Sequence, residues 1–198
     1  MRFAIISEYG LDEALLGLGL SFGRTSGYSS PLPRELRLAM YKRASLLSGK
    51  GNGHDKFLRT ITVYLDIQAP LYFWSEFDTY KIGTVAQSES KMHTLLKTPL
   101  TSACFERPIW YSLLNYLEGL RQRGNFDELL DNLPMSFLQR RIVTCNYAVL
   151  REVYIQRNQH KLPQWREFCR YLYENLKYPE LFEFGESRGS GHASESQL

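Results

Sequence analysis

Alternating and helical hydrophobic patterns divide the chain into short strands and longer helices. Apolar and polar residues alternate, with β-branched side chains among them, over residues 2–7 and 60–68, which predicts two strands. Elsewhere apolar residues recur at three- and four-residue spacing, which predicts helices. The expected helices are 11–20, 33–47, a segment that begins at Pro70 and runs through LYFWSEFDTYK, 88–97, 108–121, a short helix after Pro134, 146–157 and 163–177.

Segments without this periodicity predict the loops and the domain boundary. Residues 23–33 and 48–53 are rich in Gly, Ser and Pro and read as loops, and 82–87 reads as loop or short extended structure. Residues 184–198 are polar and low in complexity, which is typical of a disordered tail. We therefore expect one α+β domain over 1–183, rich in helices and with a small sheet.

Composition is that of a globular chain without a metal or disulfide framework. With 43% hydrophobic residues in 198, the chain can bury a core unaided. The net charge is +3 and the longest basic run is the pair Arg140-Arg141, which argues against a nucleic-acid polymer as partner. Cys104, Cys145 and Cys169 are widely spaced with no CxxC, so we expect reduced thiols and no metal site.

The targeting and cofactor motifs that the sequence lacks narrow the classes of protein to which the chain could belong. The N-terminal apolar run lacks the length and cleavage site of a signal peptide, and no apolar stretch reaches membrane-spanning length. We therefore expect a cytoplasmic protein without membrane contact. GxGxxG after a strand, GxxxxGK[ST], GxSxG and HExxH do not occur, so the common nucleotide loops, the serine elbow and the zinc-protease helix are excluded.

The segment NYAVLREVYIQRNQHKLPQW, residues 146–165, combines a core-facing helix with polar groups at its two ends. Leu150, Val153 and Tyr154 share one face of the expected helix. Asn146 lies at its start, where a side-chain oxygen can cap free backbone N–H groups, and Arg157 lies at its end. Two interpretations remain open here: a capped amphipathic helix with a solvated arginine, or one wall of a binding site.

Three segments together resemble flavin-dependent thymidylate synthases, enzymes that methylate deoxyuridylate with reduced flavin and methylenetetrahydrofolate. They are GHDKFL before the strand TITVYLDI, then FWSEFDTYKIGTVAQSESKMH, then LPMSFLQRRIVTCNYAVLREVYIQR followed by Gln164-Trp165. The resemblance covers roughly residues 48 to 183. The chain also resembles relatives of these enzymes that bacteriophages carry. It implies the helix-rich fold of that family with a small sheet, a homotetramer, a pyrimidine deoxynucleotide ligand, and FAD and methylenetetrahydrofolate as cofactors.

The resemblance also assigns the residues expected to hold the cofactor. The family's Arg-His-Arg flavin motif falls on Thr79, Tyr80 and Lys81, its preceding His on His54, and its Asn on Asn146. Two roles remain possible for His54: contact with the flavin, or a place in the Gly-rich loop. Tyr80 and Lys81 could either line a pocket or end a helix.

A second group of residues is expected on the substrate side. The family's active-site Ser is placed on Ser90, and Glu76, Ser88 and Arg157 are the expected substrate contacts. The two serines could either bind a nucleotide or cap a helix. Glu76 and Asp78 lie two residues apart and do not share a helical face, so they are not read as a catalytic carboxylate pair. Phe73 and Trp74 are expected in the core rather than stacked on a base.

The departures from the family concern its arginines. Only Lys81 keeps a charge in the flavin motif, and Met92 and Leu130 stand where arginines are expected. Arg140, Arg141 and Lys91 are the candidates for compensation. Each lost charge-assisted contact costs about 1.5–3 kcal/mol, so Thr79 and Tyr80 in place of the family's Arg and His predict flavin binding weaker by about two to four powers of ten.

Three functions follow from the resemblance and these departures. The first is a flavin-dependent one-carbon transfer to a deoxyuridylate-type nucleotide. The second is a non-catalytic nucleotide- or partner-binding protein of phage origin on the same scaffold. A weaker third is an enzyme with another nucleotide substrate.

Overall fold

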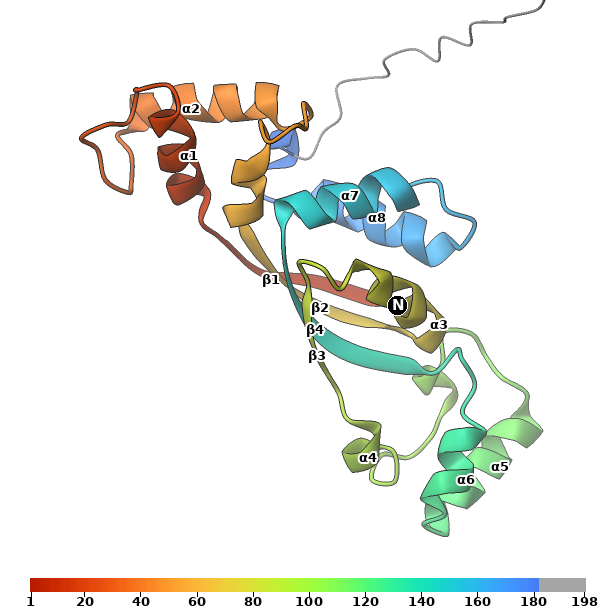
Figure 1. Cartoon of the computed structure of the whole chain (residues 1–198). Coiled ribbons are helices and arrows are strands. Elements are labelled where there is room, and N and C mark those ends of the chain that lie inside the picture. Colours follow the sequence, from red (N-terminus) through yellow and green to blue (C-terminus); the bar gives the residue numbers. More distant parts are fainter. Residues whose placement is uncertain (182–198) are drawn as a thin grey trace, which may run out of the picture.

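The computed structural model describes residues 1–181, which form a four-stranded antiparallel sheet with helices on one face and at both ends (Figure 1). The strand order is β1-β2-β4-β3, so β1 and β3 are the edges. The strands are β1 (Arg2–Tyr9), β2 (Thr62–Pro70), β3 (Val85–Ser88) and β4 (Leu138–Asn146). The helices are α1 (Leu11–Leu20), α2 (Arg34–Leu47), α3 (Leu71–Phe77), α4 (Lys91–Thr94), α5 (Tyr111–Gln122), α6 (Phe126–Asp131), α7 (Tyr147–Arg157) and α8 (Pro163–Asn175), with short 3-10 helices η1 (Lys56–Thr60), η2 (Asp78–Tyr80), η3 (Ser102–Cys104) and η4 (Pro179–Leu181).

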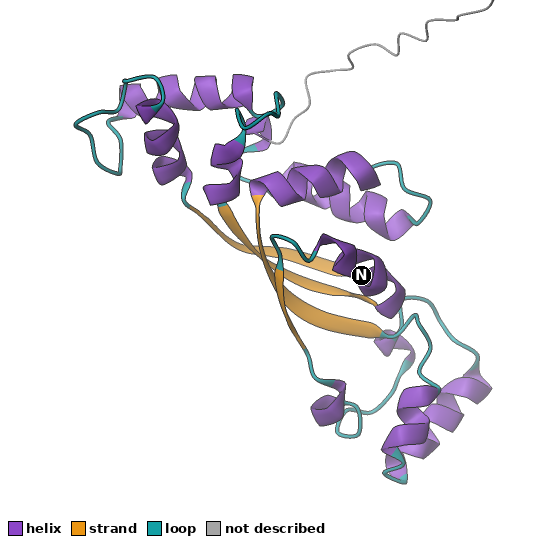
Figure 2. Ribbon diagram, in the orientation of Figure 1, coloured by secondary structure: helices purple, strands orange, loops and turns teal. Residues whose placement is uncertain are grey.

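The sheet buries one face and leaves much of the other to solvent. Along β2, every second residue from Val63 to Ala69 is buried, on the face that α3, α7 and α8 cover (Figure 2). The residues between them point the other way, where Tyr64 is 37% exposed and Tyr9 of β1 is 63% exposed. This period of two is what a half-buried antiparallel sheet requires.

Aromatic side chains fill the core between the sheet and the helices. Phe73 and Trp74 are buried, as the sequence predicts, and the indole N–H of Trp74 donates to the carbonyl of Gln139 at 3.0 Å. Trp165 and Phe168 of α8 pack against α3, with the rings of Phe73 and Trp165 centred 4.3 Å apart. The high aromatic content therefore serves this core to a large extent.

A second, smaller core lies at the other end of the sheet. It is built by α5, α6 and the segment before them, from Leu95, Leu100, Phe105, Leu117, Leu120 and Leu129 (Figure 1). Among the described residues, no helix is both long and apolar enough to cross a membrane.

The α+β class and most expected elements are confirmed. Both predicted strands are present as β1 and β2, and the helices expected over 11–20, 33–47, 108–121, 146–157 and 163–177 appear within a few residues of their predicted bounds. The helix after Pro70 is α3, continued by η2. Residues 82–87 contain the start of β3, which was expected as loop or short extended structure. The expected tail 184–198 lies outside the described residues.

Two expectations are wrong. The chain after Pro134 is not a helix but strand β4, and the short helix α6 precedes that proline. The strand was hidden because adjacent charges interrupt its alternation: Arg140 and Arg141 point to opposite faces and each meets a carboxylate, Asp66 and Asp78 respectively. The helix expected over 88–97 shrinks to α4, because Ser88 is paired with Arg141 at the sheet edge.

Candidate functional site

A cavity of about 530 Å³ opens between η1, the segment around η2 and the first turns of α7; we call it the α7 cavity. Its volume lies in the range of small-molecule sites. It is lined by Asp55, Arg59, Thr79, Tyr80, Ile82, Gly83, Asn146, Ala148, Val149, Arg151, Glu152 and Gln156. Three of the five residues expected to hold a cofactor, Thr79, Tyr80 and Asn146, are thus brought together. The other two are not part of this lining.

Asn146 joins β4 to α7 and has a defined orientation. Its side-chain Oδ1 accepts a hydrogen bond from the Val149 N–H at 3.1 Å, which is the N-cap interaction that the sequence predicts. The Oδ1 oxygen is thus used as an acceptor in the cap. The side chain's donor group, Nδ2, has no hydrogen-bond partner among residues 1–181. Asn146 therefore offers a donor to the α7 cavity while it caps the helix.

The loop that closes the cavity approaches α7 too closely for a side chain. Gly83 has a φ of 89°, and a Cβ placed on it would lie 2.8 Å from Val149 Cγ2. Both the left-handed backbone and the contact require glycine at this position. This wall of the cavity is therefore fixed by packing against the first turn of α7.

Glu76 lies at the centre of a polar cluster behind the cavity. Its Oε2 accepts from the Trp165 indole N–H at 2.8 Å and from Arg157 Nη1 at 3.2 Å, and lies 3.6 Å from His160 Nε2. Arg157 Nε also donates to the Tyr80 hydroxyl at 2.9 Å, and that hydroxyl lies 2.9 Å from Gln156 Oε1. Arg157 is thus directed toward Glu76 and Tyr80 rather than only toward the end of its own helix.

The hydroxyl groups of Thr79 and Tyr80 are engaged within the chain. Thr79 Oγ1 donates to the Glu76 carbonyl at 2.7 Å, and the Tyr80 hydroxyl is bonded as described above. Lys81 is exposed and does not line the cavity. Thr79 and Tyr80 therefore contribute walls more than free polar groups.

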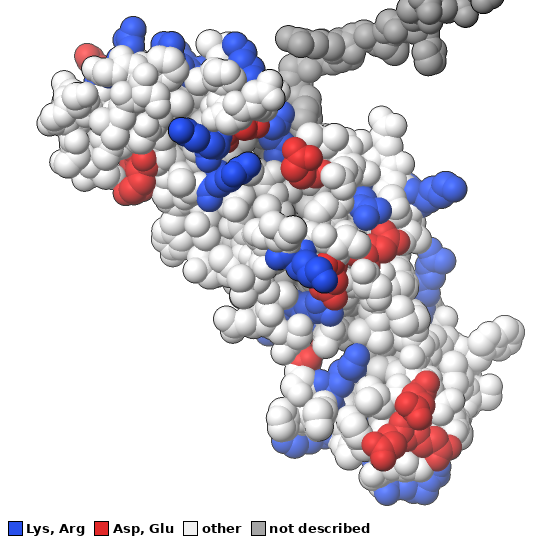
Figure 3. Space-filling view, viewed as in Figure 1, with Lys and Arg blue, Asp and Glu red and all other residues white. Residues whose placement is uncertain are grey.

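Two of the arginines considered for compensation are paired away from the α7 cavity. Arg140 makes a two-point ion pair with Asp66 at 2.8 and 2.7 Å. Arg141 pairs with Asp78 at 2.8 Å, with its guanidinium 4.3 Å from the centre of the Trp74 ring. On the face shown in Figure 3, basic side chains lie interspersed with acidic ones and form no extended basic patch.

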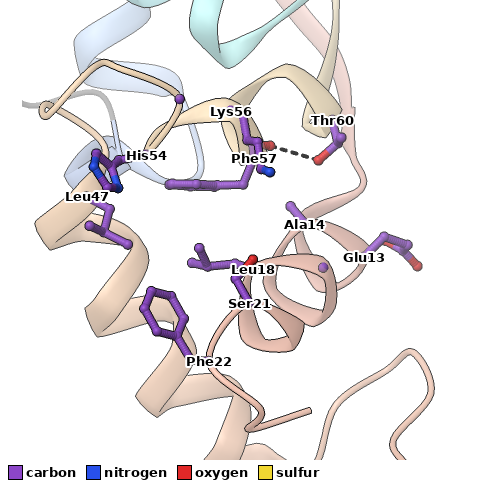
Figure 4. Close-up of a pocket in the computed structure, with 12 residues that line it drawn as sticks. Glu13, Ala14, Leu18, Ser21, Phe22, Leu47, His54, Lys56, Phe57 and Thr60 are labelled. Carbon is purple, nitrogen blue, oxygen red and sulfur yellow. Dashed lines mark hydrogen bonds between the residues drawn. The ribbon is translucent and has the colours of Figure 1, made fainter. Parts of the chain in front are cut away.

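His54 faces a different cavity. A space of about 440 Å³ lies between α1, the end of α2 and η1, and Figure 4 shows His54 beside Leu47 at its edge, with Phe57, Leu18 and Phe22 around it. The two cavities lie on different sides of η1. Lys56, Phe57 and Thr60 line this apolar cavity, whereas Asp55 and Arg59 line the α7 cavity. The structure thus does not bring His54 and Asn146 into one cavity.

Ser88 and Ser90 lie at the exposed sheet edge and line neither of these two cavities. Ser88 is in β3, and Ser90 is at the N-cap position of α4. The Ser90 side chain makes no capping hydrogen bond, although its carbonyl accepts from the N–H groups of His93 and Thr94. The helix-capping interpretation of the Ser90 side chain is therefore wrong within this chain, and its catalytic role stays a prediction.

Sequence reasoning missed the charged residues of η1 and α7. Arg151 is buried and pairs with Asp55 at 3.2 Å, which ties α7 to the segment before η1. Arg59 and Gln156 also line the cavity. The signal in the sequence was the segment DKFLRT, in which charged residues flank Phe57 and Leu58 before a strand, and this pattern does not by itself predict a 3-10 helix.

The buried thiols are not nucleophiles. Burial raises the pKa of Cys145 and that of Cys169 to about 12 each, so both remain protonated at neutral pH. Chemistry at this site would have to come from other groups.

Comparison with known proteins identifies the fold. No protein-family model matches the chain, and no curated protein sequence matches it. Two crystal structures of thymidylate synthase X (ThyX) from Helicobacter pylori, both with FAD and dUMP, are similar to it with TM-scores of 0.73 and 0.70. In each case sequence identity is 16%, and the match covers 92% of this chain and 98% of the other. The chain therefore has the fold of the flavin-dependent thymidylate synthase.

Proposed function

We propose that this protein binds a pyrimidine deoxynucleotide and carries out a flavin-dependent one-carbon transfer to a deoxyuridylate-type nucleotide. The observation that carries the proposal is the similarity over nearly the whole chain to structures that hold FAD and dUMP. The α7 cavity supports it, because Thr79, Tyr80 and Asn146 meet there. In such a reaction the reduced flavin supplies hydride and methylenetetrahydrofolate supplies the carbon.

The cavity fits part of a flavin nucleotide in size and in the donor it presents. Asn146 would donate from Nδ2 while its Oδ1 keeps the helix cap, and the rings of Tyr80 and Trp165 lie behind the wall. We propose Lys81 and His54 as further cofactor contacts, reached from outside this cavity. The chain's own residues would hold and orient the ligands rather than form a covalent bond to them.

On the substrate side we propose Glu76, Ser88, Ser90 and Arg157, with Ser90 next to the reacting base. Arg157 is the cation among them and is held by Glu76 and Tyr80. The two serines lie at the sheet edge, so a site that includes them and Arg157 would need a second copy of the chain to close it.

A second candidate function is a non-catalytic nucleotide- or partner-binding protein on the same scaffold. The observation that favours it is the internal pairing of Arg140, Arg141 and Arg157, each with a carboxylate of this chain. A guanidinium that is already paired has to exchange partners before it can bind phosphate. Phage origin, implied by the sequence resemblance, stays a prediction.

The purified protein should separate these functions. We expect a flavin absorbance well below one equivalent per chain, measurable titration of dUMP, and slow formation of thymidylate when reduced FAD and methylenetetrahydrofolate are supplied. Binding of dUMP without product would favour the non-catalytic function. Absence of binding of both FAD and dUMP would contradict the proposal as a whole.

We also propose that the protein is a homotetramer. The uncovered side of the sheet carries exposed apolar side chains on three strands: Ile6, Tyr9, Tyr64 and Val85. Such surfaces are typical of interfaces between copies of a chain. Light scattering at micromolar concentration should give about four times the 23.1 kDa of one chain. A monomer mass would contradict this prediction.

A further inference from the structure

The charges that line the α7 cavity are not equally available to a ligand. Two of them, Asp55 and Arg151, neutralise each other at 3.2 Å. Arg59, at the end of η1, has no ion pair and no side-chain hydrogen bond with any of residues 1–181. Glu152 is the other charge in the lining and lies on the exposed side of α7. Arg59 is thus the cation of this cavity whose donors are unused within the described part of the chain.

A second donor of the cavity without a partner among the described residues is the Nδ2 group of Asn146. Asn146 is half-buried at the start of α7, whereas Arg59 is exposed at the rim. A ligand that spans the cavity therefore meets a charged group at the rim and a neutral donor further in. This arrangement suits a molecule with a polar body and an anionic end.

We propose that Arg59 binds the phosphoryl group of a nucleotide that occupies the α7 cavity. This inference rests on the proposed function and adds to it the residue that recognises the anion. A guanidinium presents a planar fork of donors that matches two phosphate oxygens and does not lose its charge at any physiological pH. Arg59 would hold the charged end at the rim while Asn146 donates to the body of the ligand.

The phosphoryl group could belong to a flavin or to a pyrimidine nucleotide, and matched ligand pairs distinguish these sources. Calorimetric titration would compare FMN with riboflavin, and dUMP with deoxyuridine, on the wild-type protein and on Arg59→Ala. In the pair that binds, we expect Arg59→Ala to lower the affinity of the phosphorylated member by about 10- to 100-fold. The affinity of the unphosphorylated member should be unchanged, because it makes no contact with the guanidinium.

Three further variants test whether the effect is specific. Arg24→Ala removes an exposed arginine that lines neither cavity, so it should leave all four affinities unchanged. Arg59→Lys keeps the charge without the fork and should give an intermediate loss. Glu152→Gln removes the opposing carboxylate and should raise the affinity of the phosphorylated ligand by about two- to fivefold.

The outcomes separate this inference from the function on which it rests. If Arg59→Ala retains the full difference between a phosphorylated ligand and its partner, Arg59 does not bind the phosphate, although the proposed function stands. If the wild-type protein binds none of the four ligands, this inference is overturned, and if it also binds no FAD, the proposed function is overturned with it. Thermal unfolding excludes a trivial cause: since the Arg59 side chain makes no hydrogen bond or ion pair with the described residues, Arg59→Ala should melt close to the wild-type temperature.

Discussion

Replacing Trp165 with alanine is expected to lower the free energy of unfolding by about 3–5 kcal/mol, the range for removal of a fully buried large aromatic side chain. Trp165 is 0% exposed and packs against Phe73, Phe77 and Phe168 of α3 and α8. The substitution leaves a cavity between the two helices. It also removes the N–H group that donates to Glu76 at 2.8 Å. Chemical denaturation followed by circular dichroism would measure the change.

Trp110 provides the matched control for Trp165. It is 84% exposed at the start of α5, so Trp110→Ala should change the free energy of unfolding by less than about 0.5 kcal/mol. The two variants remove the same atoms from opposite environments. A loss below 1 kcal/mol for Trp165→Ala would show that α8 does not pack on α3 as described.

The elements that the sequence predicted best are those whose burial follows one clear period. The strand that became β2 alternates without interruption, and α7 carries Leu150 and Val153 on one buried face. Strand β4 could not be predicted because Arg140 and Arg141 are neutralised only by residues distant in sequence, Asp66 and Asp78. Local pattern carries no information about such partners, which only the paired sheet brings into reach.

The same limit explains the candidate site. The resemblance selected Thr79, Tyr80 and Asn146, and the fold places them together around one cavity. It also selected His54, which lies just before η1 and lines a second cavity. Arg59 could not be selected, because nothing in the linear sequence shows that the end of η1 faces the start of α7. Sequence motifs therefore predicted residues that form the walls of the site. Its charged residues depend on how short irregular segments pack, which the motifs do not show.

The Glu76 cluster changes what is expected of Arg157. Under both interpretations that the sequence leaves open, a solvated arginine at a helix end or one wall of a binding site, Arg157→Ala would cost little stability. In the structure its guanidinium pairs with Glu76, bonds to Tyr80 and lies 4.9 Å from the centre of the Trp165 ring. Loss of these contacts now predicts a measurable loss of stability besides any effect on binding.

Arg157→Ala is therefore expected to lower the affinity for dUMP by about tenfold or more, and the free energy of unfolding by about 1–2 kcal/mol. The binding loss reflects a missing charged hydrogen bond to the nucleotide, and the stability loss reflects a carboxylate left with fewer donors. Calorimetric titration and chemical denaturation of the same preparations would measure the two effects separately. Arg157→Lys should keep part of the affinity, because the charge remains while the fork is lost.

Glu76→Gln separates the two roles of Arg157. It removes the ion pair but keeps both the guanidinium and an oxygen that can accept from Trp165, so it should reproduce much of the stability loss of Arg157→Ala. Because Glu76 is itself a proposed substrate contact, both variants can lose dUMP affinity. A charged hydrogen bond from Arg157 to the nucleotide predicts the larger loss for Arg157→Ala, which removes the donor itself. Equal stability losses with unchanged dUMP affinity in both variants would mean that Arg157 only secures α7 and α8 against α3.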